Sequence, residues 1–546
     1  MARLLLNLPV EVLHQISNDL PNRDIKNLRR TCSFAQMVFR LRFNRIFLSP
    51  HQRDIDVFCE VASSEKFRHQ IVELFWDQSR FCLGNMTSGN TFDSFVPFGA
   101  TYDHELATEM VRFQRNRIAN TGCLISDDLT AFGGINMPLS RIAEINKYVQ
   151  KGREANEQSN NDIFALEYHI QSFPSLRRVT IGHSTNGCFF EPFYETPLVR
   201  SFPPHLVYDI ERSDYPFEPV QEHDFSSRTD WDQYSQSTRG YRAIFRALAA
   251  ARELQLEEIV IETPHGVECG LPFDFFSLGM TSDYLNLVEL LRRPHLQRLD
   301  LAITSWNSMH EYGHRSHPPK KLLKDALRGA TSLKNFSFKV DMAQNGGAWN
   351  LVRLKTLLPV GRWTNLRHFE LSSFSVKQDD LVSLLGELPQ SIRSIELSFL
   401  RFRSSESESH ASLLEEIRGR ALWDERGMNR PRLGISLRVG QHASKSIVIR
   451  VDAEIESFLY KQGMNPFRGS RGPDDVELGI GTERDTFNQC EWPRDQNFNW
   501  TEEIDMTQKR LEKLYKTGED KLRRLRDTMN KTSVNMYNLL DEDFQW

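Results

Sequence analysis

A short template of the form apolar-x-x-apolar-x-apolar recurs six times along this chain, and it limits the possible folds more than any other feature. Its last two apolar positions alternate as in a β-strand, and a helical run precedes each copy. One helix and one strand cannot cover their own apolar faces, so neighbouring units must stack. The copies are Leu176/Val179/Ile181, Leu256/Ile259/Ile261, Leu296/Leu299/Leu301, Leu333/Phe336/Phe338, Leu366/Phe369/Leu371 and Ile392/Ile395/Leu397.

This repeat predicts an α/β solenoid over residues 161–440, with a weaker seventh copy near Leu433. Its helix-plus-strand unit resembles leucine-rich repeats, which implies an irregular leucine-rich-repeat-like horseshoe. The standard pattern has Asn or Cys three residues after the last apolar position, and this chain departs from it. Those positions hold Ser184, Pro264, Thr304, Asp341, Phe374 and Leu400. The alternative is a set of ordinary βα units in an α/β domain. The recurrence of one template six times in register disfavours it.

The side chains between the apolar strand positions are expected to line the concave face of the solenoid. Their mixed charges favour a protein target, although such positions would be polar and exposed without any target as well. The candidate target-binding residues are Arg178, Glu258, Arg298, Asp300, Asn335, His368, Glu370 and Glu396.

The N-terminal stretch LPVEVLHQISNDLPNRDIKNLRRTC predicts a module of three short helices. Pro9 suits the first turn of a helix, and Leu20-Pro21 ends that helix because the residue before proline disfavours helical geometry. Asn22 and Ser33 offer caps for the second and third helices. Three short helices bury little surface alone, so a partner or the rest of the chain must cover part of the apolar stripe.

The set Leu-Pro-x-Glu-x-Leu-x-x-Ile, a proline break, Asp-Ile and Leu-Arg-x-x-Cys resembles the F-box over about residues 4–48. One departure is Phe34, where the family often has Trp after the cysteine. The resemblance implies binding to a Skp-type adaptor and through it to a cullin. The implied adaptor-binding residues are Leu8, Pro9, Val12, Leu13, Ile16, Leu20, Ile25, Leu28 and Cys32. A helical cap on the downstream domain is the alternative.

The expected domains are the F-box at 1–48, a mostly helical linker region at 49–160, the repeats at 161–440 and a C-terminal extension at 441–546. Residues 52–83 are expected to be mostly helical. An aromatic-rich insert at 183–236 is expected to pack back onto the first repeats, and a lid or a partner-binding surface is the alternative. The stretch SKSIVIRVDAEIESFLY predicts a strand and a helix, and resembles the C-terminal part of F-box proteins of filamentous fungi. A last helix is expected at about 501–530.

Charge and cysteine usage exclude several classes of protein. A formal net charge of −5 gives no basic field for nucleic acid, and the apolar run at the N-terminus is too short for a secretory signal or a membrane span. The seven cysteines are scattered and form no C-x-x-C pair. They indicate reduced thiols in the cytoplasm or nucleus.

Catalytic motifs are few. His310-Glu311-Tyr312-Gly313-His314 matches H-E-x-x-H, a motif that must be helical in a zinc peptidase. Here Gly313 lies inside the motif and Pro318-Pro319 follow closely, and both features disfavour a helix. No P-loop and no G-x-S-x-G elbow occurs. We therefore expect no catalytic residue, no resident metal and no cofactor.

Together these features predict a non-catalytic subunit of a Skp-cullin-F-box ubiquitin ligase. The F-box would bind the adaptor and the repeats would bind a target protein. The alternative is a leucine-rich-repeat scaffold without a ligase role.

Overall fold

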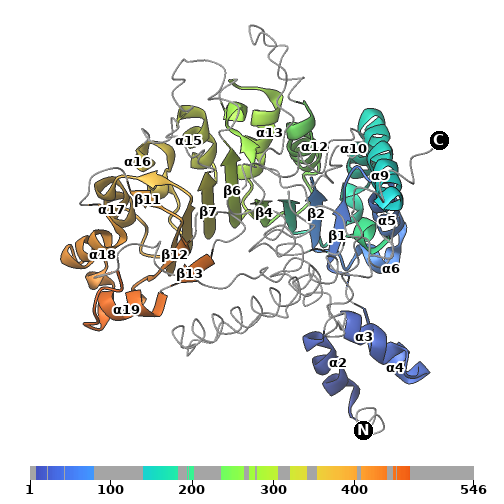
Figure 1. Cartoon of the computed structure of the whole chain (residues 1–546), viewed down its shortest axis with the longest axis horizontal. Coiled ribbons are helices and arrows are strands. Elements are labelled where there is room, and N and C mark those ends of the chain that lie inside the picture. The colour runs from blue at the N-terminus through green and yellow to red at the C-terminus, as the bar shows by residue number, and fades with distance from the viewer. Residues whose placement is uncertain are drawn as a thin grey trace, which may run out of the picture.

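The computed structural model describes the greater part of the repeat region and the N-terminal helices. The described residues are 8–20, 22–41, 43–78, 139–182, 194, 196–201, 235–263, 270–276, 279–304, 320–340, 353–402, 408–439, 447–450 and 452–467. They form an α/β fold with one large, mostly parallel sheet and helices beside it (Figure 1).

The strands along the main path of the large sheet lie side by side in chain order, from β1 to β13. All pairs are parallel except the last, β12 with β13, and β5 (Leu271–Pro272) lies off the main path beside β6. This order is compatible with a solenoid-like arrangement. The strands are β1 (Arg45–Leu48), β2 (Glu73–Asp77), β3 (Arg178–Gly182), β4 (Glu258–Glu262), β6 (Arg298–Thr304), β7 (Asn335–Val340), β8 (His368–Ser372), β10 (Ser394–Ser398), β12 (Arg432–Val439) and β13 (Ile447–Arg450). A separate pair joins β9 (Ser375–Val376) to β11 (Arg401–Phe402).

Helices follow the same order along the sheet (Figure 1). Between strands, the chain forms α5 (Gln52–Ser63), α6 (Glu65–Arg68), α9 (Leu139–Ser159), α10 (Asn161–His169), α11 (Pro197–Ser201), α12 (Ser235–Ala250), α13 (Ser282–Leu291), α15 (Lys320–Arg328), α16 (Leu354–Leu357), α17 (Gln378–Gly386) and α18 (His410–Gly419). The helix α19 (Asp452–Tyr460) follows β13, which confirms the strand and helix predicted there. Short 3-10 helices are η2 (Ile170–Ser172), η4 (Phe273–Phe276), η6 (Val360–Arg362) and η7 (Asp424–Asn429).

The repeat template marks the core correctly. Every apolar position of the six copies is buried, and so are Leu433 and Ile435 of the weaker seventh. These side chains and the inner faces of the helices form one continuous apolar cluster. Phe336 is at its centre, with its ring 4.5 Å from that of Trp363 and 6.3 Å from that of Phe369 on the next strand.

The sheet begins earlier than the sequence pattern suggested. Residues 52–83 were expected to be mostly helical, which is confirmed by α5 and α6 over 52–68, but β2 at Glu73–Asp77 is a strand of the sheet. Ile71, Leu74 and Trp76 match the template, and so do Phe43, Ile46 and Leu48. The helical prediction was wrong at β2 because Ile71, Leu74 and Phe75 also have the i, i+3, i+4 spacing of a helix.

A repeated backbone contact joins successive units at the start of the strands. The carbonyl just before a strand accepts hydrogen bonds from two consecutive N–H groups of the next unit. For example, Lys334 O accepts from Arg367 N and His368 N over 2.7 and 2.9 Å. The same contact is made by the carbonyls of Asn44, Val72, Arg177, Glu257, Gln297 and Arg367.

The N-terminal residues form a module of three helices, α2 (Val10–Asp19), α3 (Asn22–Arg29) and α4 (Ser33–Val38). The module has an apolar cluster of its own, formed by Leu13, Ile25, Ala35, Val38 and Phe39. Its helices lie together, away from the sheet (Figure 1). Ser33 was expected to cap α4, but the N-cap is Cys32. The Cys32 Sγ accepts a hydrogen bond from Ala35 N over 3.4 Å.

Other predicted features lie outside the described residues. These are most of the insert at 183–236, the H-E-x-x-H stretch at 310–314 and the helix expected at about 501–530.

Candidate functional site

One face of the large sheet is lined by the strand side chains that alternate with the buried template positions; we call it the polar face. Parallel register places them in rows across neighbouring strands. The first row runs from Arg45 through Glu73, Arg178, Glu258, Arg298, Asn335, His368 and Ser394 to Arg432. The second row includes Thr180, Val260, Asp300, Ser337, Glu370 and Glu396. All eight candidate target-binding residues belong to these two rows.

The β1–β3 end of the polar face is neutralised by its own side chains. Glu73 is fully buried, and its Oε2 accepts from Arg45 Nε over 2.5 Å. Its Oε1 accepts from Thr180 Oγ1 over 2.5 Å and lies 3.3 Å from Arg178 Nε. A buried carboxylate with two guanidinium groups and a hydroxyl holds strands together, so Arg178 serves the fold here.

The insert covers the same end of the face through Tyr194. This buried ring lies 4.5 Å from that of Phe75 and 4.9 Å from the Arg45 guanidinium carbon. Its hydroxyl donates to the Glu262 carboxylate over 2.9 Å. The expectation that the insert packs back onto the first repeats is therefore confirmed for Tyr194, and most of the insert lies outside the described ranges.

The middle of the polar face carries a paired guanidinium group. Arg298 Nη2 lies 2.6 Å from Asp300 Oδ2, and Arg298 Nη1 lies 3.8 Å from Glu258 Oε2. Burial lowers the pKa of Arg298, but the nearby carboxylates of Asp300 and Glu258 outweigh it and raise that pKa above its usual value. These three predicted residues are brought together by the structure.

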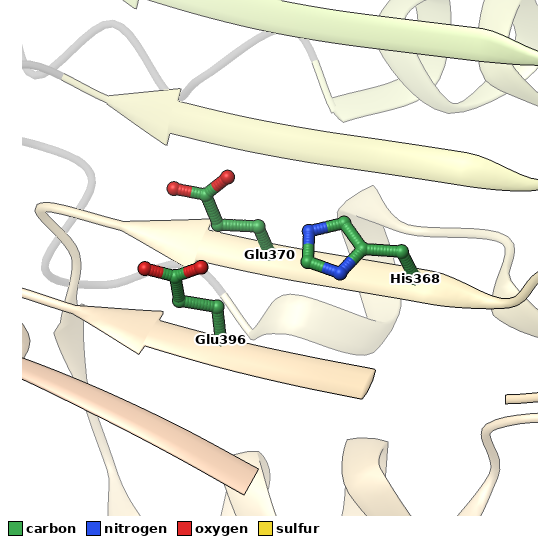
Figure 2. Close-up of side chains that lie close together, drawn as sticks. All are labelled: His368, Glu370 and Glu396. Atoms are coloured by element: carbon green, nitrogen blue, oxygen red, sulfur yellow. The ribbon is translucent and has the colours of Figure 1, made fainter. Parts of the chain in front are cut away.

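Two carboxylates face each other at the far end of the polar face. Glu370 on β8 and Glu396 on β10 are paired in register, and His368 lies two residues before Glu370 on the same face (Figure 2). The potential ligand atoms of the three side chains all lie within 4.8 Å of one another. Burial, then the charges of Glu396 and Asp300, raise the pKa of Glu370 to about 7, although Ser337 Oγ donates to its carboxylate over 2.8 Å.

In the N-terminal module, the predicted adaptor-binding residues fall into three groups: buried, half-buried and exposed. Leu13 and Ile25 are fully buried in the module core, so they stabilise it. Ile16, Leu20, Leu28 and Cys32 are half-buried. Leu8, Pro9 and Val12 are exposed, with Val12 at 36%. Val10, Phe34 and Met37 are further exposed apolar residues, Met37 at 70%, and none of them was among the predicted contacts.

Within the ranges that the structure describes, His368, Glu370 and Glu396 are the one group of three or more potential metal ligands. Among the same residues, no helix combines the length and the apolar character needed to cross a membrane.

Comparison with known proteins adds no family. No protein-family model matches the chain, and no curated protein sequence is significantly similar to it.

Proposed function

We propose that this protein is the substrate-recognition subunit of a Skp-cullin-F-box ubiquitin ligase. The observation that carries the proposal is the N-terminal module, which keeps its own core while exposing the apolar side chains of Leu8, Val12 and Met37. Exposed apolar side chains on a small helical unit are typical of a surface that a partner helix covers. The F-box-like sequence of the module supports a Skp-type adaptor as that partner.

In this proposal the rest of the described chain is an irregular leucine-rich-repeat-like solenoid. The chain-order sheet and the repeated two-donor backbone contact support it. The polar face would bind the target protein between β4 and β12, because the β1–β3 end is covered by Tyr194 and neutralised internally. The target is held near a ubiquitin-charged enzyme recruited elsewhere on the ligase, so this chain supplies proximity and no catalytic group.

The cellular compartment follows from the same proposal. Scattered cysteines support a reducing compartment, the cytoplasm or the nucleus. Cys32 and Cys59 are free thiols in the structure.

Co-purification of the full chain with a Skp-type adaptor tests the adaptor arm. Val12→Glu and Met37→Glu each place a charge on the exposed apolar surface of the module without touching its core, and both should abolish co-purification. Leu285→Glu is a matched control, since Leu285 is 51% exposed on α13, and it should leave co-purification unchanged.

A different result would favour the other function considered for this chain. If the wild-type protein does not retain the adaptor, or if both module variants retain it fully, the ligase role is wrong. The protein is then a repeat scaffold whose N-terminal helices only cap or join other parts.

A further inference from the structure

His368, Glu370 and Glu396 bring three potential metal ligands together on the polar face. The three side chains come from two adjacent strands whose register is set by the backbone ladder, so the positions of the donor atoms are held by the sheet. Side chains two residues apart on one strand lie on the same face, and the opposite residue of the next strand completes a triangle. Figure 2 shows the imidazole and both carboxylates on the same side of these strands.

The orientation of the histidine is fixed by a neighbour. Ser394 Oγ and His368 Nδ1 are 2.8 Å apart, a hydrogen bond that holds the ring and presents Nε2 toward the carboxylates. Metal-binding histidines commonly have such a partner on the other ring nitrogen. Ser337 holds the Glu370 carboxylate in the same way.

The electrostatics of the cluster also favour a cation. Glu370 and Glu396 lie opposite each other across the strand pair, and β6 adds the Asp300 carboxylate on the same face of the sheet. Lys339 lies on β7, and its Nζ donates to the carbonyl of Thr263 over 2.6 Å. A divalent ion placed between the two carboxylates would compensate their charge directly.

We propose that His368, Glu370 and Glu396 bind one divalent transition-metal ion, with zinc as the best match. One imidazole nitrogen and two carboxylate oxygens are a donor set that zinc accepts, with water in a fourth position. The imidazole disfavours Mg²⁺ and Ca²⁺, which prefer oxygen ligands only. The site would lie on the open part of the polar face, and the proposal stands independently of the ligase role.

Zinc titration of the purified full chain, freed of metal with a chelator, tests this proposal by calorimetry. We expect one zinc ion per chain. Glu370→Gln, Glu396→Gln and His368→Gln each remove one ligand and should weaken binding by more than ~100-fold, because loss of an outer partner alone costs 10–100-fold. Glutamine at 370 keeps an oxygen acceptor for Ser337, and circular dichroism reports whether each variant is folded.

Two controls separate this site from other zinc binding. Glu258→Gln removes a carboxylate from the same face on β4 and should leave the affinity unchanged. The combined variant H310Q/H314Q/H317Q removes the two histidines of the H-E-x-x-H motif and the nearby His317, and it should also bind normally. The proposal is overturned if the wild-type chain binds no zinc, or if the three ligand variants bind as tightly as wild type. If only the combined variant loses binding, the zinc is held by the histidines at 310–317 as an adventitious ion only, and the proposed site is wrong.

Discussion

Arg45 of β1 and Glu73 of β2 form a buried ion pair, with Nε donating to Oε2 over 2.5 Å. The pair joins the first strand after the N-terminal module to the sheet. Glu73→Ala leaves two guanidinium groups, those of Arg45 and Arg178, without their shared carboxylate. We predict a loss of about 3–5 kcal/mol in the free energy of unfolding, as for other buried pairs that lose one partner. Denaturation in urea would measure it.

The ion pair between Arg177 and Glu257 is a control for this prediction, because it joins the units of β3 and β4 while its side chains are 63% and 32% exposed. Glu257→Ala should change the free energy of unfolding by less than ~1 kcal/mol. Equal effects of the two substitutions would mean that burial does not set the strength of the Glu73 contact.

His51 and Asp54 at the start of α5 should affect stability with opposite dependence on pH. Burial, then the charge of Arg153, lowers the pKa of His51 to about 3. Burial raises the pKa of Asp54 to about 7, and the charge of Asp77 adds to this effect. The hydrogen bonds from Ser49 and Leu198 act in the opposite direction but are outweighed. His51 therefore favours the folded state above pH 6.5 and loses that contribution as the pH falls toward 3. Asp54 favours it below about pH 3.8 and loses that contribution as the pH rises toward 7.

Single variants at these two positions make the opposite slopes visible. The difference in unfolding free energy between wild type and His51→Gln should rise from pH 3 to 6.5, by at most about 1.4 kcal/mol per pH unit. The difference between wild type and Asp54→Asn should fall between pH 4 and 7. Slopes of the same sign in both comparisons would contradict the assignment of a neutral histidine and a protonated carboxyl in the folded chain.

Leu13 is expected to hold the N-terminal module together without contributing to the sheet. Its side chain is fully buried in the separate cluster of α2, α3 and α4. Leu13→Ala should cost about 2–5 kcal/mol, which is comparable to the whole stability of so small a core. Hydrogen exchange should then become fast in these three helices, while β7 and β8 keep their protection. Loss of protection in both parts would show that they unfold as one unit.

Gly182 at the end of β3 allows the Phe75 ring to lie against the backbone. A Cβ atom at this position would come 2.3 Å from Phe75 Cζ. Gly182→Ala should therefore displace the ring from Tyr194 and lower the melting temperature, at a cost of about 1–3 kcal/mol. Gly152→Ala on α9 is the matched control, since its added methyl group meets nothing within 4 Å, and it should be neutral or stabilising by up to ~1 kcal/mol.

Much of the sheet could be predicted from residue spacing alone. The apolar positions from Leu176 to Leu397 identified the buried side of six strands, because strand side chains alternate between faces. The same alternation placed all eight candidate target-binding residues on one face. The alternation failed as a signal at Ile71, Leu74 and Phe75. Phe75 lies between two template positions and is itself apolar, so the segment fits the spacing of a helix as well as that of a strand. In the structure the Phe75 ring packs against Tyr194, a residue more than a hundred positions away.

The sequence by itself determined the stacked helix–strand units and the three N-terminal helices, since both depend on local periodicity and on caps close in the chain. Only the tertiary structure decided which polar residues act together. Glu370 and Glu396 become neighbours through strand register, and Glu73 becomes a buried ion-pair partner through contacts with Arg45 and Arg178 on two other strands. Charge, burial and pKa depend on distances across strands, and those distances exist only once the units have stacked.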